Sequence, residues 1–366
     1  MKKYFLFLIA YLTIMQLHAQ SYNLIIGTYT NKGTSEGIYV YDYNAKTAET
    51  KLKSTTKSQN PSYLALSKDG KYVYAVNETG KTSAVSAFKF NAKNGGLSLL
   101  NTKSSEGADP CFITVDQKNV LVANYTGGSI SIFGRNADGS LAAAKQIIQH
   151  TGKSIDQKKR QESAHVHQVQ FTPDKKYVIV NDLGEDQVYS YQYNPASADK
   201  VLTLKNSIKT TPGTGPRHLA FSPNGKFAYL AHEFSGLISA YSYSNGTLTK
   251  LQEINTTTKD FSGAIDGADI HISADGKFLY ETNRGDANSI STFAILPTGA
   301  LKFVKTISTL GKGPRNFAID PSGKFLLVAH QYTNEVVIFN RDLNTGKLTD
   351  SGKRIKVGAP VCLIFE

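Results

Sequence analysis

The sequence repeats itself with a period of about 50 residues, and this repeat constrains the fold more than any other feature. The segment PSYLALSKDGKYVYAVNE, which begins at Pro61, aligns without a gap with PRHLAFSPNGKFAYLAHE, which begins at Pro216. We number the first residue of each repeat as position 0. The pattern starts at residues 61, 110, 166, 216, 267, 314 and 360. Positions +3 and +5 are apolar in every repeat: Leu64/Leu66, Ile113/Val115, Val169/Phe171, Leu219/Phe221, Ile270/Ile272, Phe317/Ile319 and Leu363/Phe365.

Each full repeat has the pattern of four short strands. An alternating strand is followed by a turn, a second strand, a third strand such as 237–243, and a fourth strand after a glycine. No segment has sustained helical periodicity, so these units favour blades arranged around a central axis. The second and third repeats have no glycine in the first turn. In the others that turn reads Asp69-Gly70, Asn224-Gly225, Asp275-Gly276 or Ser322-Gly323.

The seventh repeat is incomplete, because the chain ends at Glu366 after a single strand. The missing strands occur at the other end of the chain, where residues 23–30, 36–44 and 49–56 resemble a second, a third and a fourth strand. We therefore predict an all-β fold, a seven-bladed β-propeller closed by pairing the N-terminal strands with the C-terminal strand. Such closure leaves no central strand edge unpaired.

The first nineteen residues have the pattern of a secretory signal peptide. Lys2 and Lys3 precede an apolar run over 4–15, and Ala19 marks the expected cleavage site. The run is shorter than the roughly 20 residues of a membrane span, so we expect no stable membrane insertion after cleavage. An uncleaved anchor is the alternative. The sequence predicts a signal peptide over 1–19, a single propeller domain over 20–366, and an exported protein that is periplasmic or extracellular.

The chain is basic, and its charge of +12 falls to +10 without Lys2 and Lys3. A basic surface favours anionic partners. Its lysines and arginines are scattered on hairpin turns and do not cluster with aromatic residues, so we expect a small anionic or sugar-acid substrate and no nucleic acid. Cys111 and Cys362 are the only cysteines. The repeat places them on blades that are not neighbours, so we predict two buried thiols.

The register brings certain positions of every repeat to one rim of the propeller. In an antiparallel pair joined by a tight turn, the start of the first strand lies beside the end of the second. Position +1 therefore shares a rim with positions +16 and +17, counted with allowance for the shorter second repeat and the divided seventh one. Position +1 holds Ser62, Cys111, His167, Arg217, Ala268, Arg315 and Val361. Position +17 holds Thr30, Glu78, Tyr125, Leu183, Glu233, Arg284 and Gln331, and position +16 holds Tyr29, Asn77, Asn124, Asp182, His232, Asn283 and His330.

These rim residues are more polar than the apolar layers beneath them, so we expect the binding site there. Arg217, Arg284 and Arg315 offer planar donor forks to a carboxylate, a phosphate or a developing oxyanion. His167 and Glu233 are the groups able to move a proton near neutral pH, and burial would suit Glu233 to that task by raising its pKa. The alternative is a set of ion pairs that holds neighbouring blades together.

His165 and His167 are spaced to point to one side of a strand, as two metal ligands would be. No cysteine or third histidine is placed to complete a ligand set, so we expect no metal and no cofactor. His271, at position +4, is expected to line the channel or the core. No G-x-S-x-G elbow surrounds a serine, and the glycine pairs do not precede helices, so we expect neither a serine nucleophile nor a phosphate loop.

The chain resembles the bacterial lactonase family of seven-bladed propellers, which includes a type of 6-phosphogluconolactonase and, more distantly, fungal carboxy-muconate lactonising enzymes. The resemblance covers essentially the whole expected mature chain. In the muconate branch the implicated residues are a His, an Arg, a Glu and an Arg, which matched motif to motif imply catalytic roles for His167, Arg217, Glu233 and Arg284. The motifs that carry the resemblance are Gly27-Thr-Tyr-Thr30, Ser35-Glu-Gly-Ile-Tyr39, Asn60-Pro-Ser-Tyr63, Asn124-Tyr125, His165-Val-His167, Gly215-Pro-Arg-His218, Thr282-Asn-Arg284 and Gly313-Pro-Arg315.

The resemblance implies a lactonase that hydrolyses a sugar-acid lactone, as a 6-phosphogluconolactonase does. A water activated by Glu233 or His167 would attack the lactone carbonyl, while arginines hold the carbonyl oxygen and the acidic substituent. The export signal separates the chain from a cytosolic phosphorylated lactone, so an unphosphorylated one is an open alternative. Two other functions stay open: a lactonising isomerase of an unsaturated dicarboxylic acid, and a non-catalytic propeller that binds a sugar acid or a protein. The residues expected to bind substrate are His165, Arg315, Glu78, Asn124 and Asn283.

Overall fold

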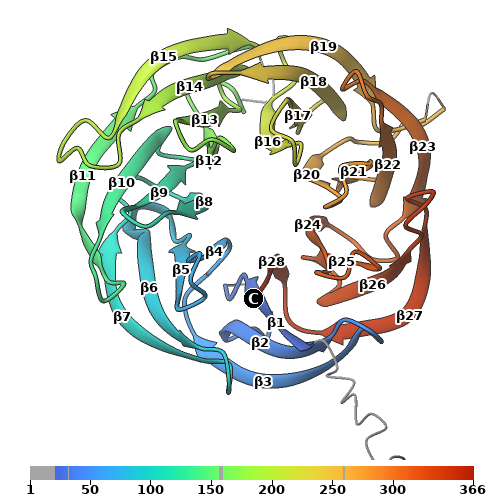
Figure 1. Cartoon of the computed structure of the whole chain (residues 1–366), viewed down its shortest axis with the longest axis horizontal. Helices are drawn as coiled ribbons and strands as arrows, with labels where there is room; N and C mark the ends of the chain where they lie inside the picture. Colours follow the sequence, from blue (N-terminus) through green and yellow to red (C-terminus); the bar gives the residue numbers. More distant parts are fainter. Residues whose placement is uncertain (1–20, 32, 156–159, 259) are drawn as a thin grey trace, which may run out of the picture.

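The computed structural model describes residues 21–31, 33–155, 160–258 and 260–366, which form a seven-bladed β-propeller (Figure 1). The fold prediction is confirmed. The signal peptide expected over 1–19 lies outside the described residues and stays a prediction. Within the described part of the chain, no helix has the length and hydropathy needed to cross a membrane.

Each blade is a four-stranded antiparallel sheet whose first strand lies nearest the centre of the ring. Blade 1 contains β4 (Leu64–Leu66), β5 (Tyr72–Asn77), β6 (Ala84–Asn91) and β7 (Gly96–Ser104), with one 3-10 turn, η1 (Gly80–Thr82). Blade 2 contains β8 (Pro110–Val115), β9 (Asn119–Asn124), β10 (Ser129–Arg135) and β11 (Leu141–Gln149). Blade 3 contains β12 (Val166–Phe171), β13 (Tyr177–Asp182), β14 (Gln187–Tyr193) and β15 (Leu202–Lys209).

The next three blades have the same order. Blade 4 contains β16 (Pro216–Phe221), β17 (Phe227–His232), β18 (Leu237–Ser244) and β19 (Thr247–Asn255). Blade 5 contains β20 (Gly267–Ile272), β21 (Phe278–Asn283), β22 (Ser289–Ile295) and β23 (Leu301–Ser308). Blade 6 contains β24 (Pro314–Ile319), β25 (Phe325–His330), β26 (Glu335–Arg341) and β27 (Leu348–Lys356).

Blade 7 joins the two ends of the chain. It contains β28 (Pro360–Phe365), β1 (Ser21–Thr28), β2 (Gly37–Asn44) and β3 (Glu49–Lys57), in that order. Ile26 of β1 pairs with Leu363 of β28, and Figure 1 shows these two strands side by side near the centre. The predicted closure is therefore confirmed.

Burial of apolar side chains between blades explains why the repeat is needed. A buried apolar cluster lies at each junction between neighbouring blades, for example the one that joins Ile25 of blade 7 to Val73 of blade 1. The residues at +3 are buried in all seven repeats and those at +5 are half-buried. Cys111 and Cys362 are buried free thiols, as predicted.

The strand register confirms the predicted rim and adds a feature that the repeat did not reveal. Position 0 pairs with position +16, as in Pro216 with His232 and Pro314 with His330. The register then shifts, so that position +1 is the unpaired residue of a β-bulge in blades 3, 4 and 6. A bulge re-aims a side chain. The residues placed at this bulge are His167, Arg217 and Arg315.

Candidate active site

Four residues that the sequence predicts as catalytic meet at the carboxylate of Glu233. Arg217 donates from Nε to Glu233 Oε2 over 2.9 Å, and Arg284 Nη2 lies 3.3 Å from the same oxygen. His167 Nε2 lies 3.9 Å from it. All four side chains are more than nine-tenths buried. The cluster therefore lies beneath the rim, and the bulges of blades 3 and 4 bring His167 and Arg217 into it.

A fifth residue, Arg160, reaches Glu233 from the solvent side. It belongs to the connection between β11 and β12. Its Nη2 donates to Glu233 Oε1 over 2.6 Å and to the Tyr125 hydroxyl over 2.9 Å. Its guanidinium lies 4.8 Å from the ring centroid of Phe234. Because the side chain is 42% exposed, Arg160 stands between the buried cluster and the solvent.

The buried arginines are held by backbone and carboxylate oxygens as well as by Glu233. Arg217 Nη1 donates to the Ala268 carbonyl over 2.5 Å. Arg284 Nη2 donates to Asp266 Oδ1 over 2.8 Å and to the Gly267 carbonyl over 3.1 Å. Burial and the nearby Arg284 and Arg315 lower the pKa of Arg217 to about 10. Arg217 therefore stays protonated near neutral pH, and the two guanidiniums form a fixed donor surface.

Glu233 and His167 differ in charge at neutral pH, although the pKa of each lies below its ordinary value. Burial alone would raise the pKa of Glu233, but attraction to Arg284, Arg217 and Arg160 outweighs burial and holds it at about 2. Burial would suit Glu233 to proton transfer near neutral pH only by raising its pKa, and these contacts lower that pKa instead. Burial and the positive charges of Arg217 and its neighbours hold the pKa of His167 well below 6.5. At neutral pH His167 is an uncharged imidazole, whereas Glu233 is a firmly ionised carboxylate.

A second acidic group, Glu78, occupies the rim in blade 1. Its Oε2 accepts hydrogen bonds from the Tyr29 hydroxyl over 2.8 Å and from the Ser62 hydroxyl over 2.6 Å. Arg315 lies 5.5 Å from the ring centroid of Tyr29. Burial alone would lower the pKa of Arg315, but attraction to Tyr29, Glu78 and Glu233 outweighs burial and raises that pKa. Glu78 and Arg315 therefore form a second polar group on the same rim.

The structure treats the other three expected substrate-binding residues differently. His165 stacks on Tyr125, with ring centroids 4.6 Å apart, so it lies beside the Arg160 contact. The Asn124 amide donates to Ser131 Oγ over 2.9 Å inside blade 2. The Asn283 amide oxygen accepts the backbone N–H of Asp266 over 3.1 Å inside blade 5. Adjacent residues on a strand point to opposite faces. The amides of Asn124 and Asn283, at position +16, therefore stabilise their own blades, whereas the residues at position +17 face the rim.

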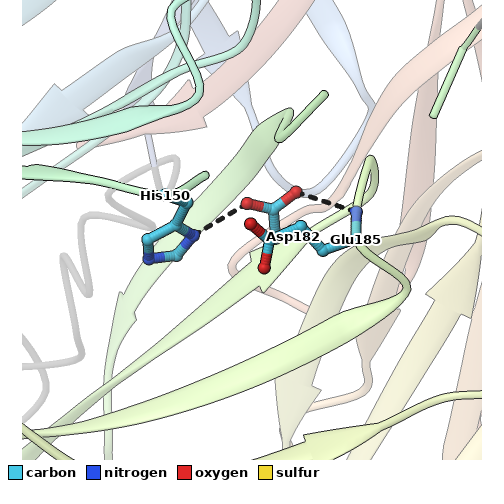
Figure 2. Close-up of side chains that lie close together, drawn as sticks. All are labelled: His150, Asp182 and Glu185. Carbon is cyan, nitrogen blue, oxygen red and sulfur yellow. Dashed lines mark hydrogen bonds and ion pairs between the residues drawn. The ribbon is translucent and has the colours of Figure 1, made fainter. Parts of the chain in front are cut away.

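A second cluster, separate from the contacts of Glu233, contains His150, Asp182 and Glu185, which lie close together in Figure 2. Among the described residues these three form a group with metal-ligand spacing, their ligand atoms all within 4.8 Å of one another. His150 Nδ1 forms a hydrogen bond with Asp182 Oδ2 over 2.7 Å, and His150 Nε2 lies 2.8 Å from the Tyr191 hydroxyl. Glu185 Oε1 accepts the N–H of Gly152 over 2.5 Å. Because hydrogen bonds already use these atoms, we interpret the cluster as a brace for the β11–β12 connection.

Comparison with known proteins agrees with this architecture. The profile of the family described as "Lactonase, 7-bladed beta-propeller" matches residues 23–365. The chain belongs to this family. It is 41% identical to a 6-phosphogluconolactonase of Formosa agariphila over 89% of this chain and 94% of that protein. It is 38% identical to the 6-phosphogluconolactonase of Bacillus subtilis over 93% and 97% of the two chains. The structure of the periplasmic gluconolactonase of Pseudomonas aeruginosa superposes with a TM-score of 0.89 at 35% identity, covering 94% and 99%.

Sequence reasoning missed Arg160 in this lactonase-family chain because that residue lies outside the repeat register. A signal was nevertheless present. The second and third repeats start at residues 110 and 166, a wider interval than between any other two consecutive starts. The extra residues form the connection between β11 and β12 that carries Arg160. Insertions between repeats form loops on one face of a repeat protein, and such loops often carry binding residues.

Proposed function

We propose that this chain hydrolyses the lactone of a sugar acid at the rim cluster around Glu233. The observation that carries the proposal is a buried, uncharged His167 placed beside two fixed guanidiniums, those of Arg217 and Arg284. Ester hydrolysis needs a proton acceptor for water and donors for the oxyanion. The lactonase family and the names of the relatives support the same reaction class.

In the proposed reaction His167 accepts a proton from a water molecule, and the water oxygen attacks the lactone carbonyl carbon. Arg217 and Arg284 hold the oxyanion that forms on the carbonyl oxygen. Collapse of the tetrahedral intermediate breaks the bond between the carbonyl carbon and the ring oxygen. His167 returns its proton to that oxygen, and the product is an open-chain hydroxy acid.

The contacts favour His167 over Glu233 as the base. Both oxygens of Glu233 are engaged by guanidiniums, Oε1 by that of Arg160 and Oε2 by those of Arg217 and Arg284. His167 Nδ1, in contrast, has no hydrogen-bond partner among the described residues. Glu233 is therefore a positioning residue that holds Arg217, Arg284 and Arg160 around the reaction centre.

The remaining rim residues would recognise the sugar acid. Arg315 and Glu78 offer one positive and one negative group, and His165 offers a ring that stacks on Tyr125. Such a mixed set suits hydroxyl and carboxylate substituents. The substrate that we propose is an unphosphorylated sugar-acid lactone. The Pseudomonas aeruginosa relative, a periplasmic gluconolactonase, supports this choice.

Export of the chain is part of the same proposal. Residues 1–19 have the charge and hydropathy pattern of a cleaved signal peptide. Cell fractionation and N-terminal sequencing of the expressed full-length protein test it. A mature N-terminus at Gln20 in the envelope fraction or the medium is the expected result, and an intact Met1 in the cytosol would contradict it.

A lactone screen with the mature protein tests the activity. Gluconolactone, its 6-phosphate and a muconolactone are each followed by acid release in a pH-stat and by product analysis. We expect hydrolysis of the sugar-acid lactones and its loss in His167→Ala and Glu233→Gln. Conversion of a muconolactone without hydrolysis would favour the isomerase. Saturable binding without turnover in the parent would favour a binding propeller, and full turnover in both variants would refute the site.

A further inference from the structure

A column of polar side chains crosses the channel directly beneath the proposed active site. It consists of His218 and Asp269, both at position +2 of their repeats, and His271 at position +4. His218 Nδ1 lies 2.8 Å from Asp269 Oδ1, and His271 Nε2 lies 2.9 Å from Asp269 Oδ2. One carboxylate thus bridges two imidazoles. His218 and Asp269 are almost completely buried. Buried polar groups of this kind are costly unless they are hydrogen-bonded, as these two are to each other.

The upper end of this column reaches His167. The ring centroids of His167 and His218 are 5.1 Å apart, with the rings nearly perpendicular at 70°. His167 Nδ1 is buried and has no hydrogen-bond partner among the described residues, whereas Nε2 faces Glu233. No hydrogen bond joins the two rings, so the second nitrogen of the proposed base would exchange a proton with His218 through one water molecule.

The lower end of the column opens at the other mouth of the channel. A cavity of about 410 Å³ lies there, lined by Asp269 and His271 together with Gln168, Gln170 and Thr114. The side chain of His271 is 40% exposed, whereas that of Asp269 is 2% exposed. The column therefore begins beside the reaction centre and ends in solvent on the opposite side of the propeller.

We propose that His218, Asp269 and His271 form a proton relay that connects His167 to the second mouth of the channel. The relay rests on the proposed hydrolysis. Water brings two protons to each turnover: one goes to the ring oxygen, and the other is released when the product acid ionises. His167 takes up the released proton and passes it to His218 Nε2. His218 gives its Nδ1 proton to Asp269, which passes one to His271 Nε2, and His271 Nδ1 releases one to solvent.

The charges around His167 favour this direction. Toward the rim, a departing proton would pass three guanidiniums, those of Arg160, Arg217 and Arg284, and like charges repel it. Toward His218 it passes one of them, Arg217, whose Nη1 lies 3.4 Å from His218 Nδ1. Toward the second mouth it meets the carboxylate of Asp269. Burial and Arg217 lower the pKa of His218 to about 4, whereas Asp269 overcomes the effect of burial and raises the pKa of His271. Proton affinity is therefore greater at the solvent end of the column than at its middle.

The same contacts could serve only to join blades, since Asn316 of blade 6 also donates to Asp269 Oδ2 over 2.5 Å. Proton exchange distinguishes the two roles without any need for catalysis. In the full-length mature protein, NMR measures the exchange of the His218 imidazole N–H with solvent. The relay predicts slower exchange in His271→Ala than in the parent or in Gln170→Ala, a control at the same cavity wall. Equal exchange in all three proteins would overturn the relay, whether or not the parent hydrolyses a lactone.

Chemical rescue provides the second measurement. In weak buffer, His271→Ala is expected to lose about tenfold in kcat with KM unchanged, less than the roughly 10²- to 10⁴-fold loss for a group that itself transfers the proton in the reaction. Added imidazole, which fits the cavity, should restore the rate, whereas pyrazole of similar size should not, because it is not protonated near neutral pH. Rescue by imidazole alone would support the relay. An unaltered kcat, or a loss that neither compound restores in a variant of parental stability, would overturn it. An inactive parent would refute the proposed hydrolysis, and the exchange measurement would then decide the relay.

Discussion

The rim carries two carboxylates at the same register position, Glu233 in blade 4 and Glu78 in blade 1, in very different surroundings. Glu233 is engaged by three guanidiniums, those of Arg160, Arg217 and Arg284. Glu78 accepts hydrogen bonds from two hydroxyls. In each blade the partner at position +1 makes much of the difference, because it is arginine in blade 4 and serine in blade 1.

This difference shows how one repeated register yields two kinds of surface. A carboxylate among buried guanidiniums fixes charge in place, which suits stabilisation of an oxyanion. A carboxylate held by hydroxyls keeps hydrogen-bonding flexibility, which suits recognition of sugar hydroxyls. We therefore assign the chemistry to the Glu233 side of the rim and substrate recognition to the Glu78 side. The following predictions test that division.

The largest effect is expected for His167→Gln. Loss of the proposed base should lower kcat by about 10²- to 10⁴-fold, the usual range for general-base removal, with little change in KM. Initial rates with the best lactone of the screen measure it. His165→Gln is the matched control, because it removes a neighbouring imidazole that the proposal assigns to binding. Equal losses of kcat in the two variants would contradict the assignment.

Glu233→Gln should cost more stability than Glu78→Gln. Removing the charge of Glu233 leaves the buried guanidinium of Arg217 without its carboxylate partner, and breaking a buried pair in this way costs about 3–5 kcal/mol. Glu78→Gln keeps an acceptor for both hydroxyls and should cost about 1 kcal/mol. Urea unfolding of both variants beside the parent measures the difference. Similar free energies of unfolding for the two variants would mean that the arginine cluster does not depend on Glu233.

Arg315→Gln should act on binding rather than on the chemical step. Loss of a hydrogen bond from the charged Arg315 guanidinium to a substrate oxygen corresponds to about a tenfold rise in KM, with kcat nearly unchanged. Arg354→Gln is the matched control, since Arg354 pairs with Asp350 on an outer strand. Steady-state kinetics with the sugar-acid lactone separate the two constants. A fall in kcat at constant KM would move Arg315 to the chemical side of the rim.

Much of this molecule was predictable from its sequence because the repeat encodes local structure and packing together. The seven repeat starts coincide with, or lie a few residues before, the first strands of the blades, and the incomplete seventh repeat predicted the closure at β1 and β28. The meeting of His167, Arg217, Glu233 and Arg284 followed from the register and from the family resemblance.

Two parts of the site could not be read from the register alone. The side chains of Asn124 and Asn283 point into their own blades because adjacent strand residues face opposite sides. The repeat pattern gives only their position next to the rim residues and does not give this orientation. The pKa of Glu233 depends on the sum of burial and three positive charges. One of those charges, Arg160, comes from a connection that no other repeat shares, so the sign of the shift required the three-dimensional contacts.

Substitution of Arg160 is expected to have the smallest effect on stability, and it tests the Glu233 side of the rim most selectively. Its side chain is 42% exposed, so Arg160→Gln should cost no more than about 1 kcal/mol at pH 7. The folded-state pKa of Glu233 is depressed from 4.5 to about 2, so its ion pairs stabilise the fold above pH 4.5 and lose that effect as the pH falls toward 2. The difference in unfolding free energy between parent and Arg160→Gln should therefore shrink over this interval. Urea titrations at pH 7, 4.5 and 2.5 measure it, and a difference that stays constant would mean that Arg160 stabilises the rim by packing on Phe234 rather than by its charge.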